Sequence, residues 1–315
     1  MPSAGPAPGL TIPFVVGSYA SEPADPAQRD AYAELLRGSD WVSGLQLPFP
    51  ARLATDPQRV AHTLHDDWTS NVITAIPGTM TRIAADPNFG LASPDTVGRS
   101  AAINFTRSVC GAVHALADAK GRAVVVAVEL HSAPTRRADP GALRASLEEV
   151  LAWDWSGAQL VVEHCDRWSD NHTAEKGFLP LASEIEIARS LGLRVGINWG
   201  RACLEERSAA AALGAVETTH RAGLLAGLMF SGVSPHTTTY GGPWADAHLP
   251  ATEDDADSLM TSAAIAASTR EASRPLVGIP PMMYLGAKIS TPADASPTRR
   301  LQLLETIARA ANVLA

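Results

Sequence analysis

The sequence predicts a single (β/α)8 barrel, and three observations support this fold class. Eight short apolar runs rich in β-branched residues recur along the chain, and most are continuously apolar, as in parallel strands buried on both faces. Helical patterns lie between these runs, and eight strand–helix units suit a chain of 315 residues. The rival doubly wound sheet lacks support, because neither GxGxxG after the first strand nor GxxxxGK[ST] occurs.

We expect a flexible tail over residues 1–10 and one barrel domain over residues 11–315. The predicted strands are 12–19, 42–49, 71–78, 123–130, 158–165, 193–199, 225–232 and 275–281. Two of the helices begin with Asp-Pro, at Asp25 and Asp56, where the aspartate caps the first turn and the proline fits it. The other predicted helices lie within 96–119, 139–153, 181–192, 205–223, 252–271 and 298–315.

Long connections are expected after the third, seventh and eighth strands, over residues 77–95, 232–250 and 280–296. In a barrel, the loops that follow the strands build the functional face. Side chains at the carboxyl ends of the strands are therefore the first candidates for a site.

Charge and composition exclude several classes of function. The formal net charge is -8 and no basic run occurs, so the phosphate-neutralising surface of a nucleic-acid-binding protein is not expected. No apolar run reaches the ~18–20 residues of a membrane span. The start MPSAGPAPGLTIP lacks the features of a signal peptide, and three widely spaced cysteines suit a reducing compartment. We expect a cytoplasmic protein without nucleic-acid or membrane partners.

Two predicted strands end alike, in VELH and VEHC. Because side chains alternate along a strand, Glu129 and His131 share one face, whereas Glu163 and His164 lie on opposite faces. We expect Glu129, Glu163 and His131 to point into the barrel mouth as catalytic groups. Two nearby carboxylates should separate in pKa, so that one is protonated near neutral pH and the other ionised. The structural alternative is that Glu129 pairs with an arginine and only closes the top of the barrel.

Further polar side chains at the strand ends and loops are candidates for binding the substrate. Asn198 could donate and accept hydrogen bonds at once, and Arg201 could hold an anionic group, unless it only pairs with Glu205. Asp166 could likewise form a solvated pair with Arg167. The remaining candidates are Gln46, His164, Lys176, His236, Tyr240 and Trp244.

Other chemistries have less support. GxSxG, HExxH and EF-hand patterns are absent from the sequence. Schiff-base chemistry is disfavoured, because Lys176 and Lys288 fall in predicted loops and no predicted strand contains a lysine. The seventh strand, LAGLMFSG, has no carboxylate, which disfavours the common layout of a retaining barrel glycosidase.

The glutamates that end the fourth and fifth strands resemble those of the xylose-isomerase-like TIM barrels. More narrowly, VVEHCD, EKGFLPL, INWGRA and GLMFSG resemble a bacterial family known only as a domain of unknown function. The superfamily resemblance implies a divalent metal (Mn, Co, Zn or Mg) held by acids of strands four, five and eight and a histidine of strand six. Glu129 and Glu163 match two of these positions, but strand six offers Asn198 and strand eight offers no acid. His131, His172 or His236 could compensate.

The leading hypothesis is an enzyme of carbohydrate metabolism that moves a proton next to a carbonyl, as in isomerisation, epimerisation or elimination from a keto-sugar. Glu129 and Glu163 would be the acid/base pair, His131 would polarise the carbonyl or shuttle the proton, and Tyr240 with Trp244 would cover the substrate. A sugar-binding sensor without catalysis, and a glycoside or phosphoester hydrolase, remain as alternatives. Barrels of this kind often dimerise, so a homo-oligomer stays open.

Overall fold

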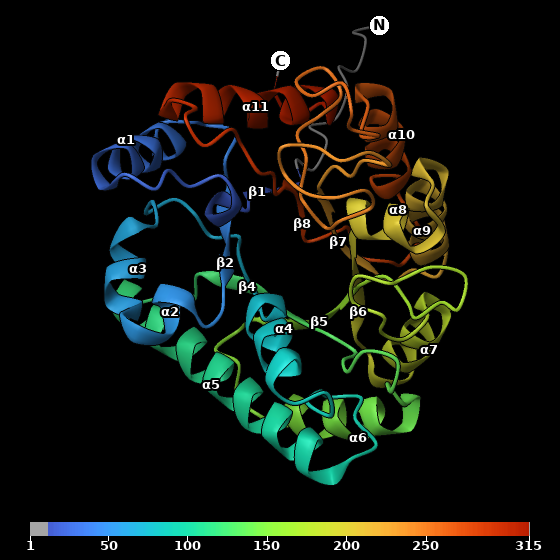
Figure 1. Cartoon of the computed structure of the whole chain (residues 1–315). Coiled ribbons are helices and arrows are strands. Elements are labelled where there is room, and N and C mark those ends of the chain that lie inside the picture. The colour runs from blue at the N-terminus through green and yellow to red at the C-terminus, as the bar shows by residue number, and fades with distance from the viewer. Residues whose placement is uncertain (1–11, 315) are drawn as a thin grey trace, which may run out of the picture.

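The strands close into a parallel barrel in the order β1 to β8, as the sequence predicts (Figure 1). The computed structural model describes residues 12–314, so the expected tail at 1–10 lies outside the described residues. The strands are β1 Phe14–Val16, β2 Gly44–Pro48, β3 Asn71–Thr74, β4 Val125–Leu130, β5 Gln159–His164, β6 Arg194–Asn198, β7 Leu225–Phe230 and β8 Tyr284–Ala287.

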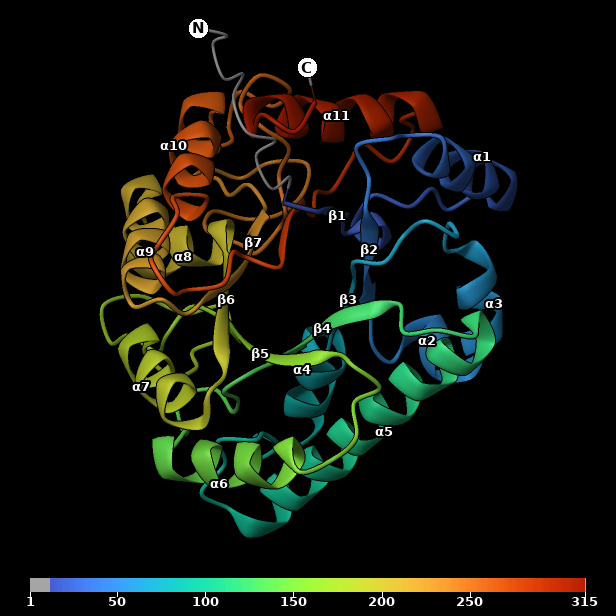
Figure 2. The same cartoon turned by 180° about the vertical axis from the view of Figure 1, so that it is seen from behind.

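Helices surround this barrel on all sides, as the view from behind also shows (Figure 2). They are α1 Pro26–Arg37, α2 Ala51–Thr55, α3 Pro57–Thr63, α4 Ile76–Ala85, α5 Thr96–Lys120, α6 Pro140–Leu151, α7 Leu181–Leu191, α8 Trp199–Glu206, α9 Ala209–Arg221, α10 Ser262–Ala272 and α11 Pro297–Ala310, with a 3-10 turn η1 at Ser18–Ala20. The carboxylates of Asp25 and Asp56 accept hydrogen bonds from the first turns of α1 and α3, as predicted.

Several boundaries differ from the predictions. The eighth strand is Tyr284–Ala287 rather than 275–281, because the apolar PLVGIPP run contains two prolines in succession and remains without strand pairing. The predicted loop at 77–95 contains α4, and the predicted helix over 205–223 is divided into α8 and α9 at Arg207, whose backbone is left-handed. The first half of the predicted helix at 252–271 is loop.

Because the eighth strand ends at Ala287, Lys288 lies at the end of a strand and not in the predicted loop. This lysine follows the last residue of β8 directly, and its backbone N–H continues the pairing by donating to the Phe230 carbonyl of β7. Its side chain therefore belongs to the barrel mouth.

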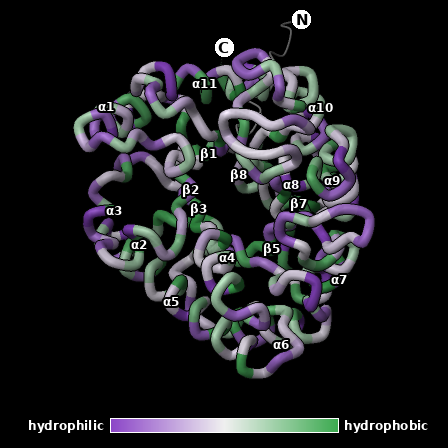
Figure 3. The backbone as a smooth tube through the Cα atoms, in the orientation of Figure 1, coloured by the Kyte–Doolittle hydropathy of each residue, from purple (hydrophilic) through white to green (hydrophobic). Residues whose placement is uncertain are grey.

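Hydrophobic residues gather on the strands and on the inner faces of the helices, with the hydrophilic positions mainly outside (Figure 3). Inside the barrel a small core forms around Tyr284, which packs with Val72, Val161 and Met229. The aromatic ring fits because β7 has glycine beside it: a Cβ at Gly227 would lie 2.1 Å from the ring. Tyr284 thereby fills the barrel below the mouth and supports the polar groups above it.

No helix within residues 12–314 is long and apolar enough to cross a membrane. The cysteines Cys110, Cys165 and Cys203 are all buried and free.

Candidate active site

The two glutamates meet at the carboxyl-terminal mouth of the barrel. Glu129 lies in β4 and Glu163 in β5, and both are at most 1 % exposed. His131 follows β4 on the same face as Glu129, and its Nε2 lies 2.6 Å from Glu163 Oε2. The structure therefore brings together the three residues that the sequence predicts to be catalytic.

Glu129 is held by two neutral donors. Gln46 Nε2 of β2 donates to its Oε2 at 2.7 Å, and the Tyr284 hydroxyl of β8 donates to its Oε1 at 2.7 Å. Burial, together with the nearby charge of Glu163, raises the pKa of Glu129 to about 8. This carboxyl group is therefore largely protonated near neutral pH.

Glu163 is held in the opposite state. Burial would raise its pKa, but the Arg201 guanidinium, whose Nη1 lies 2.9 Å from Oε2, and the His131 hydrogen bond together keep the pKa well below its usual range. Burial lowers the pKa of His131, so its imidazole is neutral. A neutral His131 donates from Nε2 to Glu163 and leaves Nδ1 as an acceptor, for which residues 12–314 provide no hydrogen-bond partner.

The segment between β7 and α10 supplies a third carboxylate. Asp246 Oδ2 lies 3.1 Å from Arg201 Nε and 3.0 Å from Lys176 Nζ, and Asp246 Oδ1 lies 3.1 Å from His248 Nδ1. Arg201 thus bridges Glu163 in the barrel to Asp246 in the covering segment. The Arg201 and Lys176 ion pairs and the His248 contact fix the position of Asp246, and with it the β7–α10 segment, beside the mouth.

Lys288 completes the polar cluster. Its side chain is fully buried, and the described residues offer no hydrogen-bond partner to its Nζ. Burial first, and then the positive charge of Arg201, lower the pKa of Lys288. Nζ lies 5.8 Å from the centre of the Tyr19 ring.

Two predicted substrate ligands are bound by other groups of the protein. His164 faces away from the interior, because it alternates with Glu163, and its nitrogens contact Glu184 Oε2 at 2.6 Å and Glu205 Oε2 at 3.1 Å. Burial opposes the charged imidazole, but Glu184 and Glu205 raise the pKa of His164 to about 10. Asp166 accepts a hydrogen bond from the backbone N–H of Lys176, which orders the loop after β5.

The aromatic cover differs from the prediction as well. His236 is exposed, Tyr240 is half-buried, and Trp244 packs with its ring centre 5.6 Å from the Arg207 guanidinium carbon. Within the described residues, no hydrogen bond or ion pair joins any of the three to the Glu129–Glu163 cluster, and Trp244 packs against the hydrophobic core. Arg201 lies in the first turn of α8 and does not pair with Glu205, which instead binds His164 and Arg167.

The sequence reasoning missed four residues of the cluster. These are Tyr19, Asp246, Tyr284 and Lys288. For Lys288 a signal existed, because the chain has only three lysines and this one ends the apolar run YLGAK. For the others, no local pattern marks them.

Six polar side chains at the barrel mouth have unsatisfied atoms. Within residues 12–314, these buried atoms lie on or directly after six different strands and have no hydrogen-bond partner: Gln46 Oε1, Thr74 Oγ1, His131 Nδ1, Glu163 Oε1, Asn198 Nδ2 and Lys288 Nζ. Buried polar groups are normally paired, and each unpaired one costs ~1–3 kcal/mol. Such a mixed ring of donors and acceptors suits a ligand that carries several hydroxyl or carbonyl groups.

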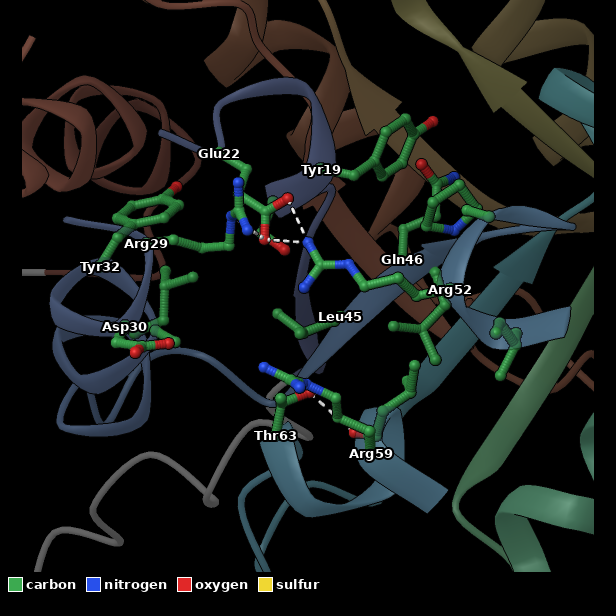
Figure 4. A pocket seen from close by; sticks show the side chains of 18 of the residues that line it. Tyr19, Glu22, Arg29, Asp30, Tyr32, Leu45, Gln46, Arg52, Arg59 and Thr63 are labelled. Carbon is green, nitrogen blue, oxygen red and sulfur yellow. Dashed lines mark hydrogen bonds and ion pairs between the residues drawn. The ribbon is translucent and has the colours of Figure 1, made fainter. Parts of the chain in front are cut away.

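A cavity of about 490 Å³ reaches the wall of the cluster from the side of β2. Tyr19 and Gln46 lie at one end of it, and Arg59 and Thr63 lie at the other (Figure 4). Since Gln46 also donates to Glu129, the cavity ends against the residues that form the site.

The residues present do not fit the divalent metal site of the superfamily. Ligand atoms of His131, Glu163 and Cys165 lie within 4.8 Å of one another, which is compatible with metal ligation by distance alone. However, Arg201 Nη1 lies 2.9 Å from Glu163 Oε2 and 3.5 Å from Cys165 Sγ, so a fixed cation already occupies the space between these groups. Glu129 is protonated near neutral pH, and Lys288 follows the strand that would supply the fourth acid. A dication beside Glu163 would be repelled by the Arg201 guanidinium, and a protonated Glu129 is a poor metal ligand.

Comparison with known proteins now assigns the family. The chain belongs to the family described as domain of unknown function DUF4862. The model of that family matches residues 15–303. An uncharacterized protein of Salmonella typhimurium is 32% identical over 269 residues, which cover 79% of this chain and 81% of that protein.

Solved structures share the fold at low sequence identity. A D-psicose 3-epimerase, determined in the presence of D-fructose, has a TM-score of 0.55 at 12% identity and covers 96% of this chain and 99% of its own. A Rhodospirillum rubrum protein, provisionally described as a xylose isomerase, has a TM-score of 0.61 at 12% identity over 97% and 99%. A family 2 AP endonuclease from Brucella melitensis has a TM-score of 0.57 at 12% identity over 91% and 96%. The chain therefore shares its (β/α)8 barrel fold with these three solved structures.

Proposed function

We propose that this protein is an enzyme that transfers a proton at the carbon next to the carbonyl group of a sugar or keto-sugar. One observation carries the proposal: a protonated carboxyl group, Glu129, and a neutral imidazole with an unpaired acceptor, His131 Nδ1, lie together in the buried mouth. An acid and a base with suitable pKa values at neutral pH are what isomerisation, epimerisation and elimination require.

The roles of the predicted catalytic residues follow from their charge states. Glu129 is assigned as the acid that donates to the carbonyl oxygen, and His131 as the base that removes the neighbouring proton. Glu163 is a weak base because it is paired with Arg201. We propose that its carboxylate orients the His131 ring and stabilises the positive charge that His131 gains when it takes a proton. Asn198 and Gln46 would bind substrate hydroxyl groups through their unpaired atoms.

Proton transfer can be tested before the reaction product is known. A panel of aldoses, ketoses and keto-acids of sugars is incubated with the protein in D₂O, and the loss of carbon-bound hydrogen next to the carbonyl is followed by proton NMR. We expect exchange with at least one substrate, and a loss of ~10²–10⁴-fold in Glu129→Gln and in His131→Asn. The exposed Glu175→Gln serves as the matched control and should keep the rate.

Three outcomes would contradict the proposal. Full exchange in both Glu129→Gln and Glu163→Gln would remove the carboxylates from the mechanism. Binding of a sugar, seen as a thermal shift without exchange over long incubation, would favour the sensor, and release of sugar or phosphate from chromogenic substrates would favour a hydrolase. A small-molecule partner is common to all three.

A further inference from the structure

We propose that Lys288 is a catalytic nucleophile, which forms an imine with the carbonyl group of the substrate. The inference rests on the proposed function, because it takes a carbonyl compound as the substrate. It adds a covalent step that the carboxylates and the histidine do not require.

The position of Lys288 supports this role. The residue directly follows β8, so its side chain enters the mouth at the level where Glu129 and Glu163 end their strands. The backbone fixes it there, since its N–H donates to Phe230 O at 2.8 Å. A Cβ at Gly17 would lie 2.7 Å from the Lys288 Cβ, so the glycine after β1 leaves room for the lysine stem. The stem is packed and its amine is held at a defined place.

The amine is free of the contacts that make most lysines inert. No acceptor within the described chain hydrogen-bonds to Nζ, whereas Lys176 Nζ pairs with Asp246 at 3.0 Å and Lys120 Nζ pairs with Asp66 at 2.7 Å. A buried amine without an ion-pair partner favours the neutral, nucleophilic form.

Charged groups from several elements face the amine. The cation Arg201 from α8 opposes its protonation, while Glu163 from β5, Asp246 from the β7–α10 segment and Glu129 from β4 favour it. His131 and His248, whose pKa values both lie below the usual range, add no positive charge at neutral pH, and Tyr19 presents its ring. Burial and Arg201 outweigh the acids, and the pKa of Lys288 is lowered.

The covalent step is balanced by the groups on the site. The Nζ lone pair attacks the carbonyl carbon, and one proton passes from nitrogen to oxygen, which gives a carbinolamine. Glu129 then gives its proton to the hydroxyl group, the C–O bond breaks, and water leaves as the protonated C=N bond forms. Glu129 is left as a carboxylate. His131 then takes the proton from the carbon next to the iminium through its unpaired Nδ1, since the positive charge of the iminium makes that proton more acidic.

Reductive trapping tests the inference directly. The full chain is incubated at neutral pH with dihydroxyacetone and sodium cyanoborohydride, which delivers hydride to the iminium carbon and fixes the adduct as a secondary amine. Peptide mass spectrometry then compares the three lysines of the chain within one sample. Because Lys288 is buried without an ion-pair partner, whereas Lys120 and Lys176 each pair with an aspartate, we expect labelling of Lys288 roughly 10-fold above the other two.

A smaller probe controls for access to the closed mouth. Formaldehyde replaces dihydroxyacetone in a parallel reaction, and Lys288→Arg, which keeps the cation and loses the nucleophile, provides the matched variant. Lys288 labelled by neither probe, while Lys120 is labelled, would overturn the inference.

The two proposals fail in different ways. If Lys288→Arg and Lys288→Met keep the wild-type rate of solvent exchange, the imine is wrong and proton transfer stands. If Lys288 is trapped but the wild-type protein exchanges no carbon-bound hydrogen, the lysine captures carbonyl compounds and the proposed function is wrong.

Discussion

Replacement of Arg201 by methionine tests whether a fixed guanidinium holds the charge of the site together. Arg201 is 1 % exposed and contacts Glu163 Oε2 at 2.9 Å and Asp246 Oδ2 at 3.1 Å. Methionine keeps much of the volume and removes the charge. The variant leaves two buried carboxylates without this partner.

The expected loss of stability follows from that burial. Breaking one buried ion pair costs ~3–5 kcal/mol, because the remaining charge stays desolvated. Lys176 and His248 still face Asp246, whereas Glu163 keeps only the His131 hydrogen bond. We therefore expect the free energy of unfolding of Arg201→Met to fall by ~3–5 kcal/mol at pH 7.5.

The loss should depend on pH in a defined direction. In the wild type the pKa of Glu163 is depressed in the folded state. The ionised carboxylate therefore stabilises the fold above the unfolded pKa, and this stabilisation is lost only as the pH falls through the lower pKa of the folded state. Without Arg201, burial raises the pKa of Glu163 above the unfolded value, and the variant gains stability as the pH falls. The difference in free energy of unfolding between wild type and Arg201→Met should decrease by up to ~1.4 kcal/mol for each pH unit by which the pH falls within this titration.

Urea denaturation followed by circular dichroism at pH 7.5 and pH 5.5 measures both effects. Arg167→Met is the control, because this arginine pairs with Glu205 and Glu206 while its side chain is 33% exposed, and its loss should cost under ~1 kcal/mol. A loss below ~1 kcal/mol in Arg201→Met, or a loss that grows as the pH falls, would refute the reasoning.

Three further predictions concern the surroundings of the site. His164→Ala should lower the free energy of unfolding by ~3–5 kcal/mol at pH 7, because Glu184 is left buried without its partner. In the wild type this pair stabilises the fold fully below the unfolded pKa of histidine, and the stabilisation is lost as the pH rises through about 10. The difference in free energy of unfolding between wild type and His164→Ala, measured by urea denaturation, should therefore be smaller at pH 9.5 than at pH 7. An equal difference at the two pH values would contradict the assignment. Gly227→Ala should cost ~1–3 kcal/mol by forcing Tyr284 from its place, and tyrosine fluorescence should change with it. Val277 is fully exposed, so Val277→Ser should change the free energy of unfolding by less than ~0.5 kcal/mol. A larger change, measured by urea denaturation, would indicate that Val277 contacts another molecule.

Local patterns were sufficient for the elements with strong signals. The Asp-Pro pairs at Asp25 and Asp56 predicted the starts of α1 and α3, because capping and the fixed proline backbone act within one turn. The alternation of side chains correctly separated Glu163 from His164, since it depends only on strand geometry. The eighth strand was misplaced, because PLVGIPP has the composition of a strand and its exclusion from the barrel depends on pairing with β1 and β7.

The sequence by itself determined the barrel class and the two inward carboxylates, because apolar runs and their spacing encode strands without knowledge of their neighbours. Only the tertiary structure decided which carboxyl group is protonated. Gln46 and Tyr284 reach Glu129 from 83 and 155 residues away, and Arg201 reaches Glu163 across the mouth. The tertiary structure also shows that Lys288, predicted to lie in a loop, is buried directly after β8. Charge states in a buried cluster depend on distances between strands that are remote in sequence, and those distances exist only after the barrel closes.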